Sequence, residues 1–512
     1  MKKILLSIAL LGTMLSSCNM DEAPAGRLDD ETAIESLNDA SKFRNGIYSN
    51  IRSLTGGEFI YNTEMQADMF VGTQINGNRL GIFSLNTFNS SNSELENMWK
   101  YPYQYIAAVN YFIPKLEALL SNESLDESSR ITLERYRGEA KWARAYYYYF
   151  LMDKFCPAYN TCDPNGNATG VPLVTNYAPS GDYASYPGRS SLNETFAQIE
   201  KDLTDAYTDL SAYEGSSAAD AKVNLSANAS YLSTNAVIAL QARLALLKGD
   251  NATAISKAEQ LINCGSYTLS DRDNYPLIWL NDTGSELIFV PYGNQAQSGG
   301  VADTGSAWIS SRTEQADYIA TSNALDMYDA ENDIRYEWFF EPRSLSVNGQ
   351  NVASPCFVKY PGNPALNTGT TNALRNLPKP FRLSEMYLIV AEAAASTDAA
   401  KANSALNTLR AARINGYESV DYAGQNLVNA IRDERTKELI GEGFRVSDLR
   451  RWQIGFSRST QYDGIYSGVA NILIPASMAM TMQAGDYRLL LPIPTGEIET
   501  NPQLAGQQNP GY

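Results

Sequence analysis

The sequence predicts a mostly helical protein, in which helix pairs of the tetratricopeptide type form a scaffold that carries long loop insertions and a few short strands. Apolar residues recur at helical spacing in paired segments, with small residues where two helices would meet. Stretches rich in Tyr, Asn, Gly and Pro interrupt the pairs at 55–92, 156–190 and 266–380. The 512-residue chain is 44% hydrophobic, which supplies enough apolar material for a large core.

The first segment has a basic start followed by an apolar run from Ile4 to Leu15. This run is too short for a transmembrane helix, which needs about 20 apolar residues. We therefore expect residues 1–17 to be a secretory signal peptide.

The run ends in "LSSC", which is similar to the lipobox of bacterial lipoproteins, where the cysteine is lipidated and becomes the mature N-terminus. Several acyl chains on one cysteine anchor a protein stably, because each buried methylene contributes about 0.8 kcal/mol. We expect Cys18 to carry this anchor and residues 18–27 to form a tether. Soluble secretion after cleavage near Ser17 is the alternative.

Helical spacing then defines the scaffold. The clearest pair is "STNAVIALQARLALLKGD" followed by "NATAISKAEQLINCG", in which Gly249 should end the first helix and Asp250 should cap the second. The tyrosine-rich "RAYYYYF" at Arg144–Phe150 lies inside a helical pattern, and we expect it to pack in the core. The other expected helices are Glu94–Leu120, Asp126–Phe155, Leu192–Tyr213, Leu383–Ser396, Ala400–Arg413 and Leu427–Trp452.

Two segments within the interruptions, "GSELIFVPYG" and "PCFVKYPG", have the pattern of short strands bounded by Gly or Pro. We expect an N-terminal region with helical repeats at 28–270 and a C-terminal region at 271–512, packed together as one body. Binding residues are often found on loops held by such a scaffold.

Composition excludes several classes of function. The formal net charge of −17, spread over the whole chain, disfavours nucleic acid as a partner. The sequence has no histidine, which removes Ser-His-Asp and Cys-His catalysis and histidine-bearing zinc sites. We expect no catalytic residues, no metal site and no cofactor. Cys156 and Cys162 flank a short loop and could form a local disulfide, or both could stay reduced.

Glu434 and Glu438 are four residues apart and share one face of a helix. Two carboxylates are sufficient for the catalytic chemistry of a glycoside hydrolase. The same segment also carries Arg435, Lys437 and several further charges, so a fixed ion-pair network is the preferred interpretation. The nearby "GEGFRV" lacks the third glycine of a dinucleotide-binding loop and is interpreted as a helix terminus.

An ordered series of segments resembles the SusD/RagB family of outer-membrane nutrient-binding lipoproteins of Bacteroidetes. The segments are "NGIYSNI", "MWKYPYQYIAAVNYFI", "YRGEAKWARAYYYYFLM", "RLALLKGDNATAISKAEQLINCGSYTL", "PFRLSEMYLIVAEA", "ALNTLRAARI", "IRDERTKELIGEGFRVSDLRRW" and "LLLPIPTGEIETNP". Together they span nearly the whole chain after the signal peptide. The resemblance implies a SusD-like fold.

The resemblance also implies a location and a role. Such proteins are lipid-anchored in the outer membrane, face the cell exterior, and deliver a nutrient to a SusC-like TonB-dependent transporter. Asp21 and Glu22, just after Cys18, resemble a surface-export signal. The ligand expected from the family is an oligosaccharide, and a RagB-like branch that handles oligopeptides is the alternative. No catalytic activity is implied.

A sugar site needs aromatic platforms and side chains that bond hydroxyl groups. Two insertions have this mixture, and loops in these regions contribute to binding in the family. Trp308 is the preferred platform, because its loop is polar and rich in Gly and Ser; a buried structural role is the alternative. The candidates are Asp68, Phe70, Asn78, Arg79 and Phe83 in residues 61–88, and Asn294, Gln295, Trp308, Arg312 and Tyr318 in residues 293–318.

Overall fold

A computed structural model describes residues 33–77, 79–218, 220, 223–300, 304–310, 313–367 and 373–512. The signal peptide, the tether with Cys18, and the candidates Asn78 and Arg312 lie outside these residues. No helix in this part of the chain is long and apolar enough to cross a membrane.

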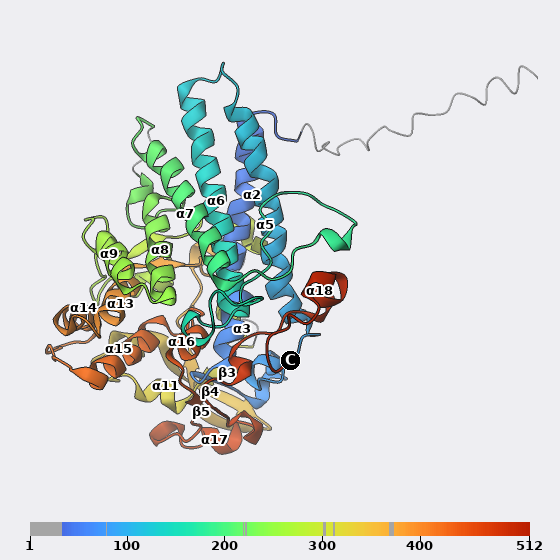
Figure 1. Cartoon of the computed structure of the whole chain (residues 1–512). Helices are drawn as coiled ribbons and strands as arrows, with labels where there is room; N and C mark the ends of the chain where they lie inside the picture. The colour runs from blue at the N-terminus through green and yellow to red at the C-terminus, as the bar shows by residue number, and fades with distance from the viewer. Residues whose placement is uncertain are drawn as a thin grey trace, which may run out of the picture.

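Long helices make up the N-terminal part of the scaffold. Figure 1 shows α2, α5, α6 and α7 standing side by side, and α6 contacts the other three. Because helices cover it on both sides, α6 buries most of its circumference, including Tyr147 and Tyr148. The core position expected for the tyrosine cluster is therefore confirmed. The bounds are α2 Leu37–Leu54, α5 Ser93–Leu120, α6 Glu127–Phe155 and α7 Leu192–Glu214.

Shorter helices continue the stack. They are α8 Thr234–Lys248, α9 Asn251–Ile262, α13 Leu383–Ala394, α14 Ala399–Arg413 and α15 Gly424–Leu439. The α8–α9 pair packs directly against α13, although more than a hundred residues separate them in the chain. Gly249 ends α8 with a φ of 78°, and the Asp250 side chain accepts a hydrogen bond from the Thr253 amide at 3.1 Å. Both helix boundaries agree with the sequence prediction.

The expected span Leu427–Trp452 is divided into α15 and α16, Arg445–Trp452. Gly441 and Gly443 lie between them with φ values of 78° and 87°, a conformation that favours glycine. A Cβ atom on Gly441 would lie 2.8 Å from the Phe357 ring. The "GEGFRV" segment is a helix terminus, as expected, and the close approach of Phe357 requires glycine there.

Short strands form three small sheets in the described residues. The largest has the order β1-β3-β5-β4 and is antiparallel throughout. Its β4–β5 hairpin turns at Asn348 and Gly349, both with positive φ, which matches the right-handed twist of paired strands. The two segments predicted as strands overlap β2 and the end of β5, and the sequence analysis missed the other strands, including β4. The strands are β1 Phe70–Gly72, β2 Leu287–Phe289, β3 Tyr318–Ala320, β4 Phe340–Val347, β5 Gln350–Phe357, β6 Phe381–Arg382, β7 Phe456–Ser457 and β8 Thr481–Met482.

Small helices fill the remaining insertions. Those that bear on the candidate sites are α3 Glu58–Gln66, α12 Ile334–Phe339 and α18 Thr495–Thr500. The others are α4 Gly81–Ser84, α10 Leu277–Leu280, α11 Ser322–Asp326 and α17 Val469–Ile472.

Glu434 and Glu438 lie in a buried ion-pair network, as predicted. Of the two neighbours named with them, Lys437 pairs with Glu434, whereas Arg435 pairs with Asp448 instead. Glu434 pairs with Arg335 and Arg410, each at 2.7 Å. Glu438 receives hydrogen bonds from Arg335, Arg382 and Arg413 at 2.9–3.1 Å. These guanidinium groups hold the pKa of the Glu438 carboxyl far below its usual range, although burial alone would raise it. Both carboxylates therefore fasten α15 to its neighbours.

Glu64 of α3 fastens the turn between α15 and α16 to the first insertion. Its carboxylate accepts hydrogen bonds from the backbone amides of Gly443 (2.7 Å) and Gly441 (3.2 Å). Burial raises the pKa of this carboxyl to about 7, against the lowering effect of the two amides. The carboxyl of Glu64 therefore titrates in a physiological pH range.

The free energy of unfolding should contain a component from Glu64 that is lost between about pH 5 and pH 8. The folded protein holds a proton on this carboxyl that the unfolded chain releases above its ordinary pKa of 4.5, so stability falls as the pH rises. At about 1.4 kcal/mol per pKa unit, the component is at most about 3 kcal/mol. Urea unfolding should show that Glu64→Gln destabilises the protein less at pH 8 than at pH 5. The exposed substitution Glu123→Gln is the control, and an equal destabilisation by Glu64→Gln at both pH values would contradict the assignment.

Candidate ligand-binding site

The two insertions chosen from the sequence lie side by side. Strand β1 of the first pairs with β3 at the end of the second, with Gly72 opposite Tyr318. The Arg79 guanidinium donates hydrogen bonds to the carbonyl oxygens of Ser306 (3.0 Å) and Ala307 (2.8 Å) and pairs with Asp317. The Tyr318 hydroxyl donates to the carbonyl oxygen of Arg79. The described parts of residues 61–88 and 293–318 therefore pack against each other.

Trp308 is not an exposed platform, and this correction changes the site. Its side chain is 1% exposed. The ring packs against Phe70 with centroids 5.1 Å apart, against Phe357 at 4.9 Å and nearly parallel to Tyr360 at 6.0 Å. The prediction was wrong because it used only the polar residues next to Trp308 in the sequence. The three rings that cover Trp308 come from elsewhere in the chain.

Four further candidates are buried side chains that stabilise the fold. Phe70, Phe83 and Tyr318 are fully buried. Asp68 is 6% exposed and forms a bidentate pair with Arg445, with both distances at 2.8–2.9 Å. These side chains hold the insertions together and are not available to a ligand in this structure.

The remaining described candidates, Arg79, Asn294 and Gln295, lie at the surface. The Asn294 amide donates to the Tyr292 hydroxyl at 3.0 Å, and Tyr292 is 48% exposed. The sequence analysis missed Tyr292, because it ends a segment that was interpreted only as a strand.

A cleft of about 430 Å³ opens beside the second insertion; we name it the tryptophan cleft. Its volume lies within the usual range of small-molecule sites. Aromatic rings and four charged side chains, including Lys359 in the floor, dominate its lining. The residues that matter here are Trp279, Trp308, Trp338, Tyr360, Glu337, Glu341 and Arg343.

Two rings of this cleft are partly exposed, Trp338 and Tyr360, and the Tyr360 ring packs against Trp279 and Trp308. Trp338 is half-buried at the end of α12, and its ring stacks on no other aromatic ring in the described part of the chain. The exposed carboxylate of Glu337 lies next to Trp338, and the carboxylate of Glu341 accepts a hydrogen bond from Arg343 at 2.6 Å. A half-exposed ring with carboxylate and guanidinium groups at its edge can stack on a sugar ring and bond its hydroxyl groups.

Buried charged side chains lie at the floor of the cleft and pair with one another. Lys359 donates to the Glu442 carboxylate at 2.7 Å and lies over the Trp279 ring at 4.4 Å. Burial lowers the pKa of Lys359 to about 8. The indole N–H groups of Trp279 and Trp308 have no acceptor in the described part of the protein. The floor is therefore rigid and retains unused hydrogen-bond donors.

The sequence signal for this cleft was "EWFFEPR", which mixes acids, aromatic residues and an arginine. The segment lies inside the long insertion at 266–380 but outside residues 293–318, the part of that insertion chosen from the sequence. Helix α12 and strand β4 place Glu337, Trp338, Glu341 and Arg343 at the edge of one cleft.

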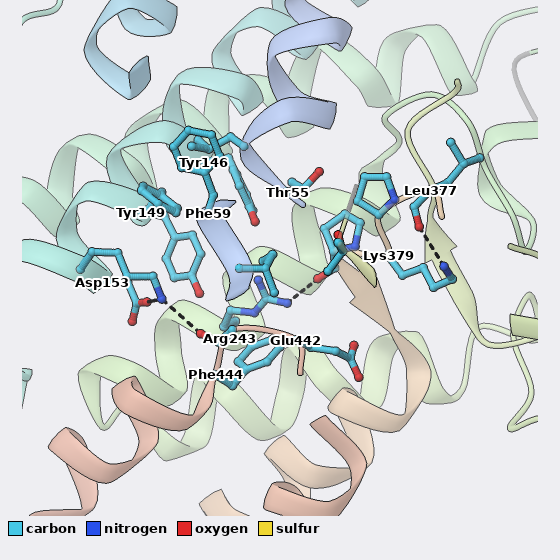
Figure 2. A pocket seen from close by; sticks show the side chains of 18 of the residues that line it. Thr55, Phe59, Tyr146, Tyr149, Asp153, Arg243, Leu377, Lys379, Glu442 and Phe444 are labelled. Carbon is cyan, nitrogen blue, oxygen red and sulfur yellow. Dashed lines mark hydrogen bonds and ion pairs between the residues drawn. The ribbon is translucent and has the colours of Figure 1, made fainter. Parts of the chain in front are cut away.

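A second cavity lies deeper, and Figure 2 shows side chains from distant segments meeting around it. Tyr146, Tyr149 and Asp153 come from α6, Arg243 from α8, and Glu442 from the turn before α16. Its volume of about 60 Å³ holds only a few water molecules. Its charges are paired internally, since Arg243 forms a bidentate pair with Glu385 at 2.7 Å. We interpret it as a structural cavity.

The disulfide considered between Cys156 and Cys162 is not formed. Both thiols are free. Cys156 is buried at the end of α6, where burial raises the pKa of its thiol to about 11, whereas Cys162 contacts the carbonyl oxygen of Ala158 at 3.8 Å. The two side chains have different environments, and each is accommodated without a bond to the other.

Comparisons with known proteins agree with this fold. A curated relative, SusD-like protein P2 of Formosa agariphila, is 25% identical over 99% of this chain and 98% of its own. A SusD superfamily protein from Bacteroides thetaiotaomicron is 24% identical, with a TM-score of 0.75 over 93% of this chain and all of the other. A putative sugar binding protein from Bacteroides vulgatus is 26% identical, with a TM-score of 0.73 over 94% of this chain and all of the other.

Two family models match different parts of the chain. The one described as "Starch-binding associating with outer membrane" matches residues 21–235. The one described as "SusD family" matches residues 346–512. With the helix-pair scaffold and these relatives, the matches show that the chain belongs to the SusD/RagB family.

Proposed function

We propose that this protein is a non-catalytic, lipid-anchored oligosaccharide-binding protein on the outer face of the outer membrane, which delivers its ligand to a SusC-like TonB-dependent transporter. The tryptophan cleft carries the proposal, because Trp338 offers a ring beside Glu337, Glu341 and Arg343 in a space large enough for sugar residues. The similarity to a putative sugar binding protein supports the same ligand class.

The environments of the paired carboxylates support binding without hydrolysis. Glu434 and Glu438 are occupied by arginine side chains and are fully buried. Glu337 and Glu341 lie on the exposed rim of the cleft, whereas a general acid is normally held in apolar surroundings that keep it protonated. Neither pair has the environment that glycoside hydrolysis requires.

The location is supported by the sequence and by a family model, and the transporter partner follows from the family resemblance. The lipobox-like segment ending at Cys18 predicts a lipid anchor. The family model that matches residues 21–235 is described as associating with the outer membrane.

The test is calorimetric titration of the full chain in detergent with neutral oligosaccharides and with mixed peptides, followed by analysis of the sugars for cleavage. We expect saturable heat with at least one oligosaccharide and no cleavage products. Heat with peptides alone would contradict the ligand class, and cleavage would contradict the binding role. The protein extracted from its native membrane should also bring a TonB-dependent transporter with it, and extraction without one would contradict the delivery role.

A further inference from the structure

A third and larger hollow lies on another part of the molecule. It has a volume of about 860 Å³, twice that of the tryptophan cleft, and runs between α5 and residues 172–187, with α18 nearby. Figure 1 shows the chain that follows α6 looping out beside α5. We call this hollow the tyrosine groove; the lining used below is Tyr103, Asn110, Asn176, Tyr177, Tyr186, Glu497 and Asn501.

The walls of the tyrosine groove are fastened by side chains of the scaffold. The Tyr103 hydroxyl donates to the carbonyl oxygen of Pro172 at 2.9 Å. The Asn110 amide and the Tyr148 hydroxyl both donate to the carbonyl oxygen of Val174, at 2.8 and 2.7 Å.

At the other end of the segment, the Asn501 amide donates to the carbonyl oxygen of Pro187 at 2.9 Å. Because both ends are fixed, the groove exists before any ligand arrives, which lowers the entropy cost of binding.

Tyrosine rings stand at the mouth of the groove. Tyr177 is 46% exposed, and its ring packs against Tyr111 at a centroid distance of 5.2 Å and an angle of 75°. The Tyr186 hydroxyl donates to the carbonyl oxygen of Ser180 at 2.7 Å, and its ring packs against Tyr183. Each exposed face is therefore held in a fixed direction, as a stacking platform must be.

The groove carries almost no charge. Among its lining residues, Glu497 is the only one with an ionisable acidic or basic side chain, and burial raises the pKa of that carboxyl. The accessible polar groups include the Asn176 amide and the Thr175 hydroxyl. No lysine or arginine lines it, so a sulfate or uronate would lose its water without finding a cation. This lining suits uncharged sugar rings.

We propose that the tyrosine groove is a second carbohydrate site that takes a neutral oligosaccharide, stacked on Tyr177 and Tyr186 and bonded through the Asn176 amide. The proposal rests on the carbohydrate-binding role proposed above, but not on the tryptophan cleft. Two separated sites on one anchored protein would let a long glycan be held at two points, which strengthens binding beyond either site alone.

The test titrates the full chain in detergent with neutral hexasaccharides of glucose, mannose, galactose and xylose, and with hexagalacturonate and mixed peptides for comparison. Binding of a neutral hexasaccharide at the groove should weaken by about tenfold or more in Tyr177→Ala, as for other central aromatic contacts. Tyr207→Ala is the matched control, because Tyr207 is 37% exposed on α7 and lines neither site. Thermal unfolding should show that both variants fold.

Trp338→Ala separates the two proposals. Binding that survives Trp338→Ala and is lost in Tyr177→Ala establishes the groove, whatever happens at the tryptophan cleft. The groove proposal is overturned if Tyr177→Ala leaves every titration unchanged. It is overturned as well if no neutral sugar gives any heat of binding. It is also overturned if the only ligand sensitive to Tyr177→Ala is hexagalacturonate or a peptide.

Discussion

Replacing Glu438 with alanine is expected to destabilise the protein by about 3–5 kcal/mol, the largest effect that the structure predicts for one side chain. Its carboxylate receives hydrogen bonds from Arg335, Arg382 and Arg413, and all four side chains are at most 1% exposed. Removing the carboxylate leaves buried guanidinium groups with too little negative charge around them. The midpoint of urea unfolding at neutral pH measures the loss.

The control is Glu259→Ala, which removes one half of a partly exposed pair with Lys401 at 2.6 Å. Solvent screens that pair, so its loss should cost at most about 1 kcal/mol. A Glu438→Ala variant as stable as Glu259→Ala would show that the arginine side chains find other partners, and the network would not be the fastening point of α15.

Trp338→Ala is expected to weaken oligosaccharide binding at the tryptophan cleft by at least about tenfold, which corresponds to about 1.4 kcal/mol. Trp338 is partly exposed and stacks on no other ring of the described residues, whereas Tyr360 packs against Trp308, which lies in the floor and is 1% exposed. The measurement is calorimetric titration with the oligosaccharide that binds the wild-type chain best. Binding that is lost in Tyr177→Ala is assigned to the tyrosine groove and does not count toward this prediction.

Tyr292→Ala is the matched control for Trp338→Ala. Tyr292 is 48% exposed beside Asn294 and Gln295, outside the tryptophan cleft. Its removal should leave the affinity within about twofold of wild type, as expected of a side chain that does not contact the ligand. If Tyr292→Ala abolished binding and Trp338→Ala did not, the ligand would lie over the surface candidates Asn294 and Gln295.

The scaffold was largely predictable because its signals are local. Apolar spacing located α5, α6 and α7 to within about two residues, and Gly249 and Asp250 marked the boundary between α8 and α9. Strand β4 was missed because its eight residues show no clear alternation and include a proline. Its pairing with β5 depends on the Asn348-Gly349 turn.

The candidate site was predictable by region and not by residue. Residues 61–88 and 293–318 do meet, through the pairing of β1 with β3 and through Arg79. The aromatic residue chosen from them, Trp308, is buried, and the partly exposed ring of Trp338 comes from a segment that was not chosen.

The order of residues along the chain was sufficient to predict the helix-pair scaffold, the family and the ion-paired role of Glu434 and Glu438. The scaffold depends on spacing and caps within a few turns of helix, the family on the order of segments along the chain, and the ion-paired role on the many charges around the two carboxylates in the sequence. Only the tertiary structure decided which rings face solvent. The exposure of Trp308 depends on Phe70, Phe357 and Tyr360, which neighbour it only in space, and no local pattern records such neighbours.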